Sequence, residues 1–239
     1  MIPKIVHYCW FGKGEMDELS TKCIESWKEN LKGYEFKLWN ETNFNIDINT
    51  YVREAYAIKK YAFVSDYVRV YVLYNYGGIY LDTDVEVINS FDELLINKSF
   101  IGFENDHIGT GIIGSIAKTN WLKIILNSYD NENFISLTGN INLYPNPLRF
   151  QKLLLEIGLE LEDKDQIIGE NIKVYTTDVL CAKSFETGVI SMTNKTLSIH
   201  HFNASWTVKR RSISNIVKTR LIALTCKVKL MTNKLLNYV

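Results

Sequence analysis

The sequence predicts one α/β domain followed by a basic C-terminal tail. With 239 residues, the chain is long enough for one sizeable hydrophobic core and short for two. Residues 2–39 alternate a strand pattern, a helical pattern and a second strand pattern, which is how layered α/β sheets begin. An apolar helical stretch, two glycines and a buried strand follow at 50–87.

The N-terminal elements follow from composition and spacing. Residues 2–10 are rich in Ile, Val, Tyr and Trp, which predicts a buried strand. Apolar residues at helical spacing over 16–31, with Gly33 just beyond them, predict a helix. Residues 35–39 predict the second strand, and the apolar stripes of 50–76 predict two successive helices.

The later elements are predicted in the same way. We expect strands at 99–104, 112–116, 172–176 and 197–202, a short helical turn at 92–95, and helices at 119–129 and 147–157. The polar, turn-rich stretch 131–146 predicts a variable lid or acceptor loop.

Two acidic residues organise the rest of the chain. Gly77 and Gly78 introduce an apolar strand with Asp82 and Asp84 at its middle, and residues two apart on a strand point to the same side. Adjacent carboxylates repel one another unless a cation shares them, and Mg²⁺ or Mn²⁺ commonly binds one or two carboxylates plus substrate phosphates. A solvated turn is the alternative, because Asp-x-Asp is a common tripeptide. The apolar lead-in through Tyr80 favours a metal–diphosphate site at the end of a sheet strand.

A second charged pair lies on the preceding helix. Asp66 and Arg69 are three residues apart and Ser65 and Arg69 four apart, so all three share a helix face. A surface ion pair is the ordinary explanation. However, the helix is so apolar that most of its circumference must be buried, and a buried charge needs a partner or a polar ligand. We therefore favour a pair that faces a ligand.

Glycines at 109, 111 and 114 match the dinucleotide-binding fingerprint in spacing only. That fingerprint follows a strand and opens a helix, whereas 112–116 is a strand pattern. We interpret the glycines as a close approach of the backbone to a small group, such as a transferred group.

His200 and His201 end the last predicted strand and should point to opposite faces. A lone histidine is more often structural, but beside a diphosphate–metal site one of them can act as a ligand, and His201 is the candidate. Trp206 could donate its indole N–H to a phosphate or fill the core.

Charge is segregated along the chain. The formal net charge is zero, yet the eight cations of residues 208–239 have no acid among them, which leaves minus eight for 1–207. Apolar residues at helical spacing between these cations predict a basic amphipathic helix. It could cap the core or contact an anionic membrane surface. No base-reading motif accompanies the charge, so we expect no nucleic-acid partner.

The cysteines and the N-terminal residues indicate in which cellular compartment the protein is expected. Cys9, Cys23, Cys181 and Cys226 lie far apart without metal-ligand spacing, so neither a disulfide framework nor a zinc site is expected. The chain enters strand sequence at once, which predicts no signal peptide, and no stretch reaches the roughly 20 apolar residues of a membrane span. We expect a cytoplasmic protein, with peripheral attachment to the inner face of the membrane through the tail.

Four blocks of this sequence resemble the marker blocks of glycosyltransferase family 32, the DXD sugar transferases that include bacterial capsular-polysaccharide enzymes. They are IPKIVHYCWFG at 2–12, SDYVR at 65–69, GGIYLDTD at 77–84 and HHFNASW at 200–206. The resemblance implies a GT-A type fold, in which a mixed, mostly parallel sheet is flanked by helices. It divides the chain into a catalytic domain at 1–207 and a tail at 208–239. It also implies a nucleotide-sugar donor, with UDP-sugar favoured, a divalent metal, commonly Mn²⁺ with Mg²⁺ as an option, and retention of anomeric configuration.

Similarity to the large clostridial toxin glycosyltransferases assigns roles to the donor-binding positions. Trp10 would stack on the donor base beside Cys9, Asp66 and Arg69 would hold the hydroxyls of the donor sugar, and Trp206 would close over the diphosphate. Ser65 and Tyr80 complete the donor-binding set.

The same similarity implies the metal ligands. Asp84 would bind the metal directly, and Asp82 would touch the ribose or sugar and reach the metal through water. The toxins' metal-ligating glutamate falls at His201 and their metal-ligating serine at Ala204, so Asn203 or Ser205 could substitute.

Two mechanisms and two other functions remain open from the sequence. Retention needs either a carboxylate nucleophile, for which Glu104 and Asp106 are the nearby candidates, or attack from the face of the leaving group, which we prefer. A sugar-1-phosphate nucleotidyltransferase also uses paired acids, but its basic glycine-rich phosphate loop is absent. A catalytically silent sugar-nucleotide or membrane-binding module is the other alternative.

Overall fold

A computed structural model describes the backbone of residues 1–203 and 213–236 and, within the last helix, the side chains of 219–232. The strands are β1 (Ile5–Cys9), β2 (Glu35–Trp39), β3 (Gly78–Leu81), β4 (Val85–Val87), β5 (Ser99–Glu104), β6 (His107–Ser115), β7 (Gln166–Ile168), β8 (Ile172–Tyr175) and β9 (Ser198–His200). The helices are α1 (Glu18–Asn30), α2 (Thr50–Ala57), α3 (Tyr61–Tyr76), the 3₁₀ turn η1 (Asp92–Ile96), α4 (Asn120–Asn127), α5 (Asn146–Glu156), α6 (Thr177–Leu180) and α7 (Ile213–Leu236).

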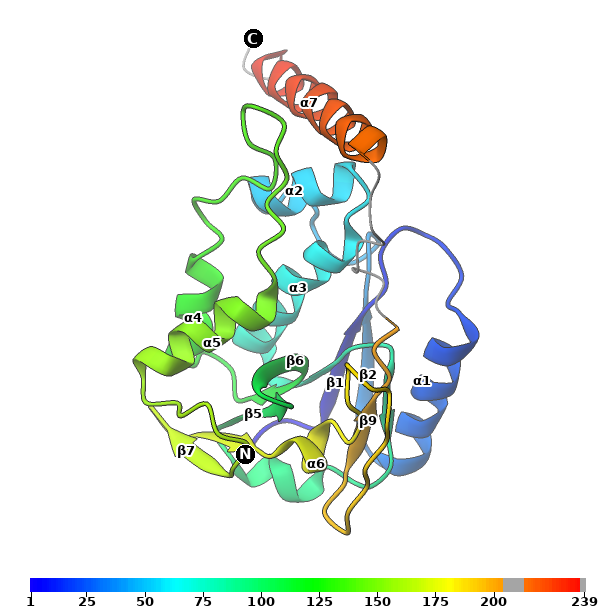
Figure 1. Cartoon of the computed structure of the whole chain (residues 1–239), viewed down its shortest axis with the longest axis vertical. Helices are drawn as coiled ribbons and strands as arrows, with labels where there is room; N and C mark the ends of the chain where they lie inside the picture. The colour runs from blue at the N-terminus through cyan, green and yellow to red at the C-terminus, as the bar shows by residue number, and fades with distance from the viewer. Residues whose placement is uncertain (204–212, 237–239) are drawn as a thin grey trace.

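The main sheet has seven strands in the order β2-β1-β3-β6-β5-β8-β7. Figure 1 shows β1, β2, β5 and β6 of this sheet, with α2 and α7 above them. The pairs β1–β2, β1–β3 and β5–β8 are parallel, and β6 and β7 run antiparallel to the other strands. A second, two-stranded sheet pairs β4 with β9. This mixed, mostly parallel sheet with flanking helices confirms the predicted fold class and agrees with the GT-A type arrangement that the resemblance implies.

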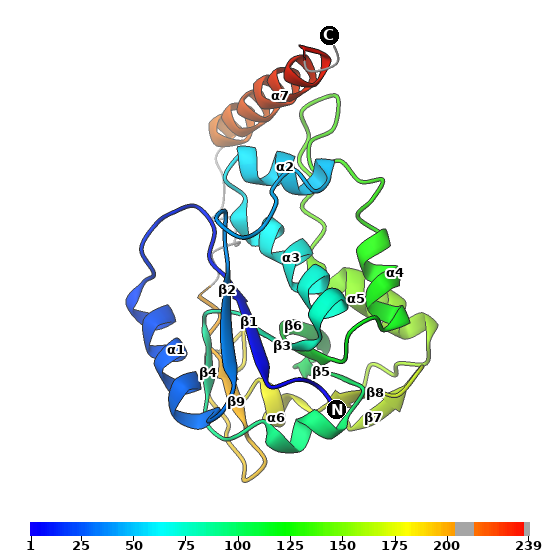
Figure 2. The same cartoon turned by 180° about the vertical axis from the view of Figure 1, so that it is seen from behind.

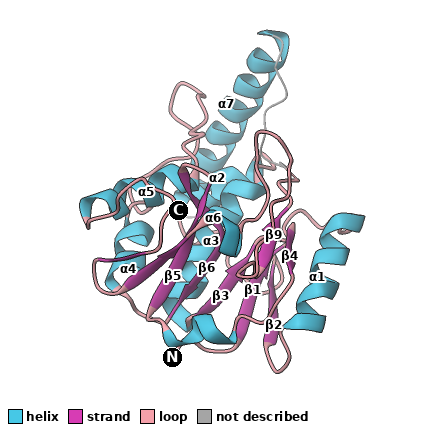
Figure 3. Ribbon diagram, turned by 60° about the horizontal axis from the view of Figure 1, so that its bottom comes forward, coloured by secondary structure: helices cyan, strands magenta, loops and turns pink. Residues whose placement is uncertain are grey.

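Helices and the small sheet cover opposite faces of the main sheet. Side chains alternate along β3, so Tyr80 enters a core cluster with α2–α5, whereas Ile79 and Leu81 enter a second cluster with α1, β4 and α6. Figure 2 shows α3 on the first face, with α4 and α5 beside it. Figure 3 shows α1 next to β2 and β4, and α7 projecting away from the sheet.

Glycine is required where α3 turns into β3. Gly77 ends the helix with φ +67°, and its N–H bonds to the Leu73 carbonyl. Gly78 follows with φ +107°, and a Cβ there would lie 2.6 Å from the backbone oxygen of Ile5. The two glycines therefore allow α3 to turn directly into β3, which pairs with β1 and leads to Asp82.

Most predicted elements are confirmed, with differences at strand ends. Residues 35–39 and 99–104 form strands with the predicted bounds, and 50–76 divides into two helices. However, β3 stops at Leu81, so Asp82 and Asp84 lie after the strand and not at its middle. Short β7 and α6 were not predicted from the sequence. No helix in the described part of the chain combines the length and apolarity needed to cross a membrane.

Candidate active site

The acid pair lies in the turn that joins the two sheets. Asp82 N–H still bonds to the Gly111 carbonyl of β6 at 2.8 Å, and Val85 N–H then closes the turn onto the Asp82 carbonyl at 3.0 Å. The prediction of a continuous strand was wrong here because the chain leaves the main sheet after Leu81 and joins β9 in the small one. Asp82 and Asp84 nevertheless point to the same neighbour, His200.

Arg69 of α3 connects the two acidic motifs. Its Nη2 lies 2.9 Å from Asp66 Oδ1, and its Nη1 lies 3.2 Å from Asp82 Oδ2. Nη1 also donates to the Thr110 carbonyl at 2.6 Å, and the guanidinium packs over the Tyr80 ring. Arg69 is only 5 % exposed, so it and Asp66 form a buried pair and not an ordinary surface ion pair, with Asp82 as a second partner.

Burial shifts the pKa of both acids that contact Arg69. For Asp66, burial raises the pKa to about 6 against the opposing effect of Arg69. For Asp82, burial also raises the pKa, with Arg69 again opposing it and Asp84 adding to it. The tyrosine hydroxyl of Tyr80 donates to Asp82 Oδ1 at 2.9 Å, so Asp82 is held from both sides.

The remaining donor-binding candidates lie around this centre. Cys9 is buried, which raises the pKa of its thiol to about 12, and its thiol interacts with Tyr80 and Ser65. Trp10 is half-buried just after β1, and its indole N–H donates to the Gly14 carbonyl at 2.7 Å. Trp206, Ala204 and Ser205 lie outside the described residues.

Of the two successive histidines, His200 faces the acid pair. In the β4–β9 register, Val85 lies opposite His200, and this brings the His200 ring next to Asp84, with Nε2 3.3 Å from Oδ1. His201 points the other way and places its Nε2 2.7 Å from Glu86 Oε2. The imidazole of the predicted candidate ligand His201 is therefore not brought to the acid pair, although the His201 backbone N–H donates to the Asp84 carbonyl at 2.9 Å. The alternation of faces was correctly predicted, but the choice between them depends on a register that the sequence does not reveal.

Asp84 is stabilised as a carboxylate. Burial alone would raise its pKa, but the hydrogen bond and charge of His200 and the Asn203 N–H lower it to about 2. The Asn203 N–H donates to Asp84 Oδ2 at 2.7 Å, and the Asn203 amide donates to Asp17 Oδ2 at 2.8 Å. Asn203, a possible substitute ligand, thus contacts Asp84 through its backbone.

The donor set suits a hard divalent cation. One ligand atom each from Asp82, Asp84 and His200 lie within 4.8 Å of one another. Two carboxylates and one imidazole are ligands that Mn²⁺ and Mg²⁺ accept, and further positions would remain for substrate phosphates. The residues present therefore fit the metal that the sequence implies.

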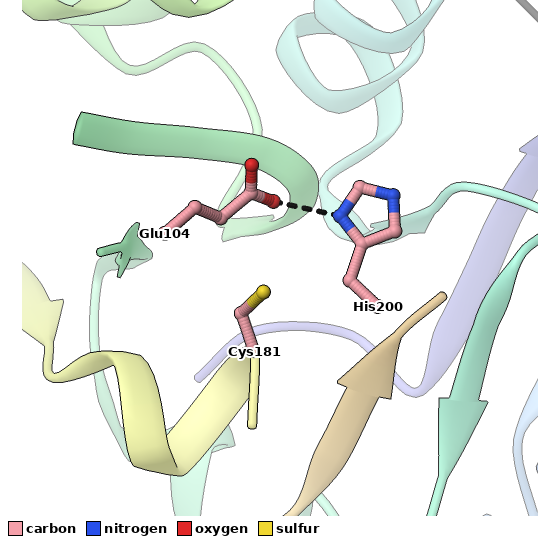
Figure 4. Close-up of side chains that lie close together, drawn as sticks. All are labelled: Glu104, Cys181 and His200. Atoms are coloured by element: carbon pink, nitrogen blue, oxygen red, sulfur yellow. Dashed lines mark hydrogen bonds and ion pairs between the residues drawn. The ribbon is translucent and has the colours of Figure 1, made fainter. Parts of the chain in front are cut away.

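Glu104 and Cys181 flank the other edge of His200 (Figure 4). Glu104 Oε1 lies 2.8 Å from His200 Nδ1, and the two carboxylates of Glu104 and Asp84 raise the pKa of His200 although burial lowers it. Asp106, the other candidate nucleophile, lies in the exposed turn between β5 and β6. The structure therefore brings Glu104, and not Asp106, to the site.

The glycines of β6 make room for this cluster. A Cβ on Gly109 would lie 2.5 Å from the Glu104 carboxylate, and one on Gly111 would lie 2.9 Å from the His200 ring. Close approaches do occur at these glycines, but the groups that approach are side chains of the protein itself and not the small group that we expected. His200 and the Thr110 carbonyl are site groups that sequence reasoning missed.

The comparisons with known proteins agree with this geometry. Residues 17–101, which include the acid pair, match the family model described as glycosyltransferase sugar-binding region containing DXD motif. The chain contains this glycosyltransferase region. The Asp82-Thr83-Asp84 turn is its DXD motif, and the resemblance noted in the sequence is thereby confirmed.

Parts of the chain are similar to curated mannosyltransferases of a yeast. The sequence is 32 % identical over 130 residues to inositol phosphoceramide mannosyltransferase 3 of Schizosaccharomyces pombe. This match covers 44 % of this chain and 34 % of the relative. It is also 27 % identical over 143 residues to inositol phosphoceramide mannosyltransferase 2 of Schizosaccharomyces pombe. This match covers 54 % of this chain and 39 % of the relative. The DXD-containing chain thus spans well under half the length of these curated relatives.

Two solved glycosyltransferases resemble the chain in structure. PaToxG glycosyltransferase superposes with a TM-score of 0.47 at 16 % identity, covering 65 % of this chain and 68 % of that one. A glycosyltransferase involved in the glycosylation of the major capsid of PBCV-1 superposes with a TM-score of 0.45 at 15 % identity, covering 92 % and 99 %.

Proposed function

We propose that this chain is a retaining, metal-dependent glycosyltransferase that moves a hexose from a nucleotide-diphosphate sugar to a glycan or lipid-linked acceptor. The observation that carries the proposal is the convergence of Asp82, Asp84 and His200 within 4.8 Å, beside the Arg69–Asp66 pair and inside the DXD region. The similarity to inositol phosphoceramide mannosyltransferases supports a hexose donor and an acceptor with a lipid part. The resemblance to capsular enzymes supports a role in bacterial surface polysaccharide synthesis.

Three residues would hold the metal, and its identity as Mn²⁺ or Mg²⁺ is part of the proposal. Asp84 and His200 would bind it directly, with Asp82 reaching it directly or through water. A divalent cation bound there supplies the positive charge that stabilises the departing diphosphate. His200 thereby takes the role for which His201 was the candidate.

The Arg69 cluster would orient the donor sugar. Arg69 donates to Asp66, to Asp82 and to a backbone carbonyl, so its own hydrogen bonds are largely used within the protein. Its function would be to fix both carboxylates, whose remaining lone pairs can accept from sugar hydroxyls. Trp10 would stack on the donor base and Trp206 would close over the diphosphate, as the resemblance implies.

Attack from the face of the leaving group is the proposed route to retention. The acceptor hydroxyl would approach the anomeric carbon beside the departing phosphate oxygen, which takes up the proton. The Glu104 carboxylate is already bound to His200, which speaks against its use as a nucleophile. A glycosyl group trapped covalently on Glu104 or Asp106 and found by mass spectrometry would contradict this route.

A donor screen tests the activity. UDP- and GDP-sugars, including the mannose donor, are incubated with the full chain and Mn²⁺ or Mg²⁺, and release of nucleoside diphosphate is measured. We expect turnover of one donor, its loss in Asp84→Asn, and normal turnover in the matched control Asp47→Asn, which removes an exposed acid outside the site. Binding without turnover of any donor would favour a silent module. Formation of a nucleotide sugar from sugar phosphate and nucleoside triphosphate would favour a nucleotidyltransferase.

The tail would attach the enzyme to an anionic membrane, where a lipid-linked acceptor is found. Within α7, Leu221, Val228 and Met231 recur on one side of the helix and are 64 %, 54 % and 49 % exposed. Such a stripe on a helix that exposes Arg220 and Lys229 fits the surface of an anionic bilayer, where each cation contributes about 1 kcal/mol. This would give a cytoplasmic enzyme peripheral contact with the inner face of the membrane.

Liposome cosedimentation tests this attachment. Leu221→Glu combined with Val228→Glu should abolish binding to phosphatidylglycerol liposomes. The matched control, Ile96→Glu with Ile167→Glu, replaces two comparably exposed apolar residues of the domain and should bind normally. Equal binding by both double variants, or equal binding of the wild type to neutral liposomes, would contradict the proposal.

A further inference from the structure

Glu104 and His200 come from separate sheets and meet at the edge of the metal site. Glu104 is the last residue of β5 in the main sheet, and His200 is the last residue of β9 in the small one. Glu104 Oε1 lies 2.8 Å from His200 Nδ1, while His200 Nε2 faces Asp84 at 3.3 Å (Figure 4). The two ring nitrogens of His200 therefore face different carboxylates, Nδ1 that of Glu104 and Nε2 that of Asp84.

The hydrogen bond to Glu104 determines which nitrogen can bind a metal. When Nδ1 keeps its proton and donates it to Glu104, and the metal takes the place of the proton on Nε2, the Nε2 lone pair is presented to the metal beside Asp84. A carboxylate that accepts from the distal N–H of a metal-binding histidine fixes the tautomer and the ring orientation and makes the imidazole a better ligand.

The fold reserves space for this pair. Gly109 and Gly111 lie two residues apart on β6, so they face the same side of the sheet. A Cβ at 109 would come within 2.5 Å of the Glu104 side chain, and a Cβ at 111 would come within 2.9 Å of the His200 ring. The absence of side chains at both positions allows Glu104 to reach His200.

We propose that Glu104 is a positioning residue of the metal site, which holds His200 Nδ1–H so that Nε2 binds the metal together with Asp82 and Asp84. The inference rests on the metal site of the proposed function, and it assigns Glu104 a role other than that of nucleophile. Glu104 acts through His200 and does not contact the substrate.

Mn²⁺ binding to the full chain, measured by calorimetry without donor or acceptor, tests the proposal. Glu104→Ala should weaken Mn²⁺ binding by about 10- to 100-fold. Glu104→Gln keeps an acceptor oxygen and should lose less. Gly109→Ala leaves Glu104 in the sequence but pushes its side chain away, so it should weaken binding as Glu104→Ala does.

Two controls separate Glu104 from its neighbours. Asp106→Asn removes a carboxylate two residues away in the exposed turn and should bind Mn²⁺ normally. Cys181→Ala should also bind normally, because a thiol is a poor ligand for Mn²⁺. Wild-type affinity in Glu104→Ala, or an equal loss in Asp106→Asn or Cys181→Ala, would overturn the proposal.

A spectroscopic measurement distinguishes positioning from a general structural effect. In the Mg²⁺-loaded wild type, ¹⁵N NMR should show His200 with a protonated Nδ1, and Glu104→Ala should change this state while the amide spectrum of the rest of the chain is kept. An unchanged His200 ring in Glu104→Ala would overturn the inference.

If no donor is turned over but these metal-binding and NMR results hold, the proposed function fails and the role of Glu104 stands. If the wild type binds no divalent cation, the inference fails, and transfer in the presence of EDTA then reports on the function separately.

Discussion

Lys227 of α7 forms a buried ion pair with Glu54 of α2. The two side chains are 9 % and 2 % exposed, with Nζ 2.5 Å from Oε1. The other oxygen of Glu54 accepts from the Ile135 N–H at 2.8 Å, and Lys227 also donates to Asn133. One carboxylate therefore joins α2, the loop after α4 and the C-terminal helix, so this tail cation is part of the core and not of a solvated face.

Replacement of Glu54 should destabilise the protein strongly. Glu54→Ala leaves a buried ammonium group without its charged partner and a buried N–H without its acceptor, and removal of one partner of a buried pair typically costs about 3–5 kcal/mol. We expect this loss in the free energy of urea unfolding and a partial recovery when Lys227→Met is added. The exposed pair of Lys22 and Glu18 provides the control, because Lys22→Ala should leave unfolding unchanged. Similar unfolding curves for Glu54→Ala and the wild type would show that α7 is not held by this pair.

Arg69→Lys should inactivate the enzyme although it keeps the charge. The ammonium group of lysine cannot reach Asp66, Asp82 and the Thr110 carbonyl at once, so both carboxylates lose their fixed orientation. A misplacement of about 1 Å in a catalytic group can cost about 100-fold in rate, and we expect a loss of at least this order in kcat. The matched control is Arg53→Lys on α2, which should keep full activity because Arg53 is outside the site. If Arg69→Lys has normal kcat and only a raised KM, the orienting role is wrong.

Acid should destabilise the fold through His7. Its Nδ1 accepts from the Trp39 indole N–H at 3.0 Å, and its Nε2 donates to the Gly77 carbonyl at 2.8 Å, so both nitrogens are used by the neutral ring. Burial lowers the pKa to about 4 from 6.5, although the bond to Gly77 opposes this. As the pH falls from 6.5 to 4, the unfolded chain binds a proton that the folded state excludes, which costs about 3 kcal/mol of stability.

Urea unfolding between pH 7.5 and 4 measures this contribution. The wild type should lose stability as the pH falls through this range, and His7→Gln should show a shallower dependence. His107→Gln, which alters an exposed histidine, should match the wild type. Equal pH dependence in His7→Gln and the wild type would show that another group is responsible.

Local patterns in the sequence were sufficient for most elements of the fold. Strand 35–39 and the break between α2 and α3 follow from composition and spacing, and the apolar character of α3 correctly predicted that Arg69 and Asp66 are not on the protein surface. The acid pair was recognised because an apolar strand precedes it. These features depend on residues close together in the chain.

What the sequence could not show depends on contacts between distant segments. Glu104 and His200 are separated by 96 positions, and their contact arises only when β5 and β9 end at the same place. The change of sheet after Leu81 depends on pairing with β9, which fixes His200 and not His201 beside Asp84. The sequence did not distinguish Lys227 from the other tail cations, because its partner Glu54 lies 173 positions away.

The two adjacent histidines provide a direct test of the metal site. His200→Ala removes an imidazole from the group formed with Asp82 and Asp84, whereas His201→Ala removes one that contacts Glu86. We expect His200→Ala to lose donor turnover and most Mn²⁺ affinity, and His201→Ala to keep both, because its ring faces away from the acid pair. Addition of EDTA should abolish wild-type turnover, and Mn²⁺ in excess should restore it in the wild type and in His201→Ala. Loss of Mn²⁺ binding in His201→Ala together with normal binding in His200→Ala would reverse the assignment, because it would require the β9 strand end to turn its other face to Asp84 when the metal is bound.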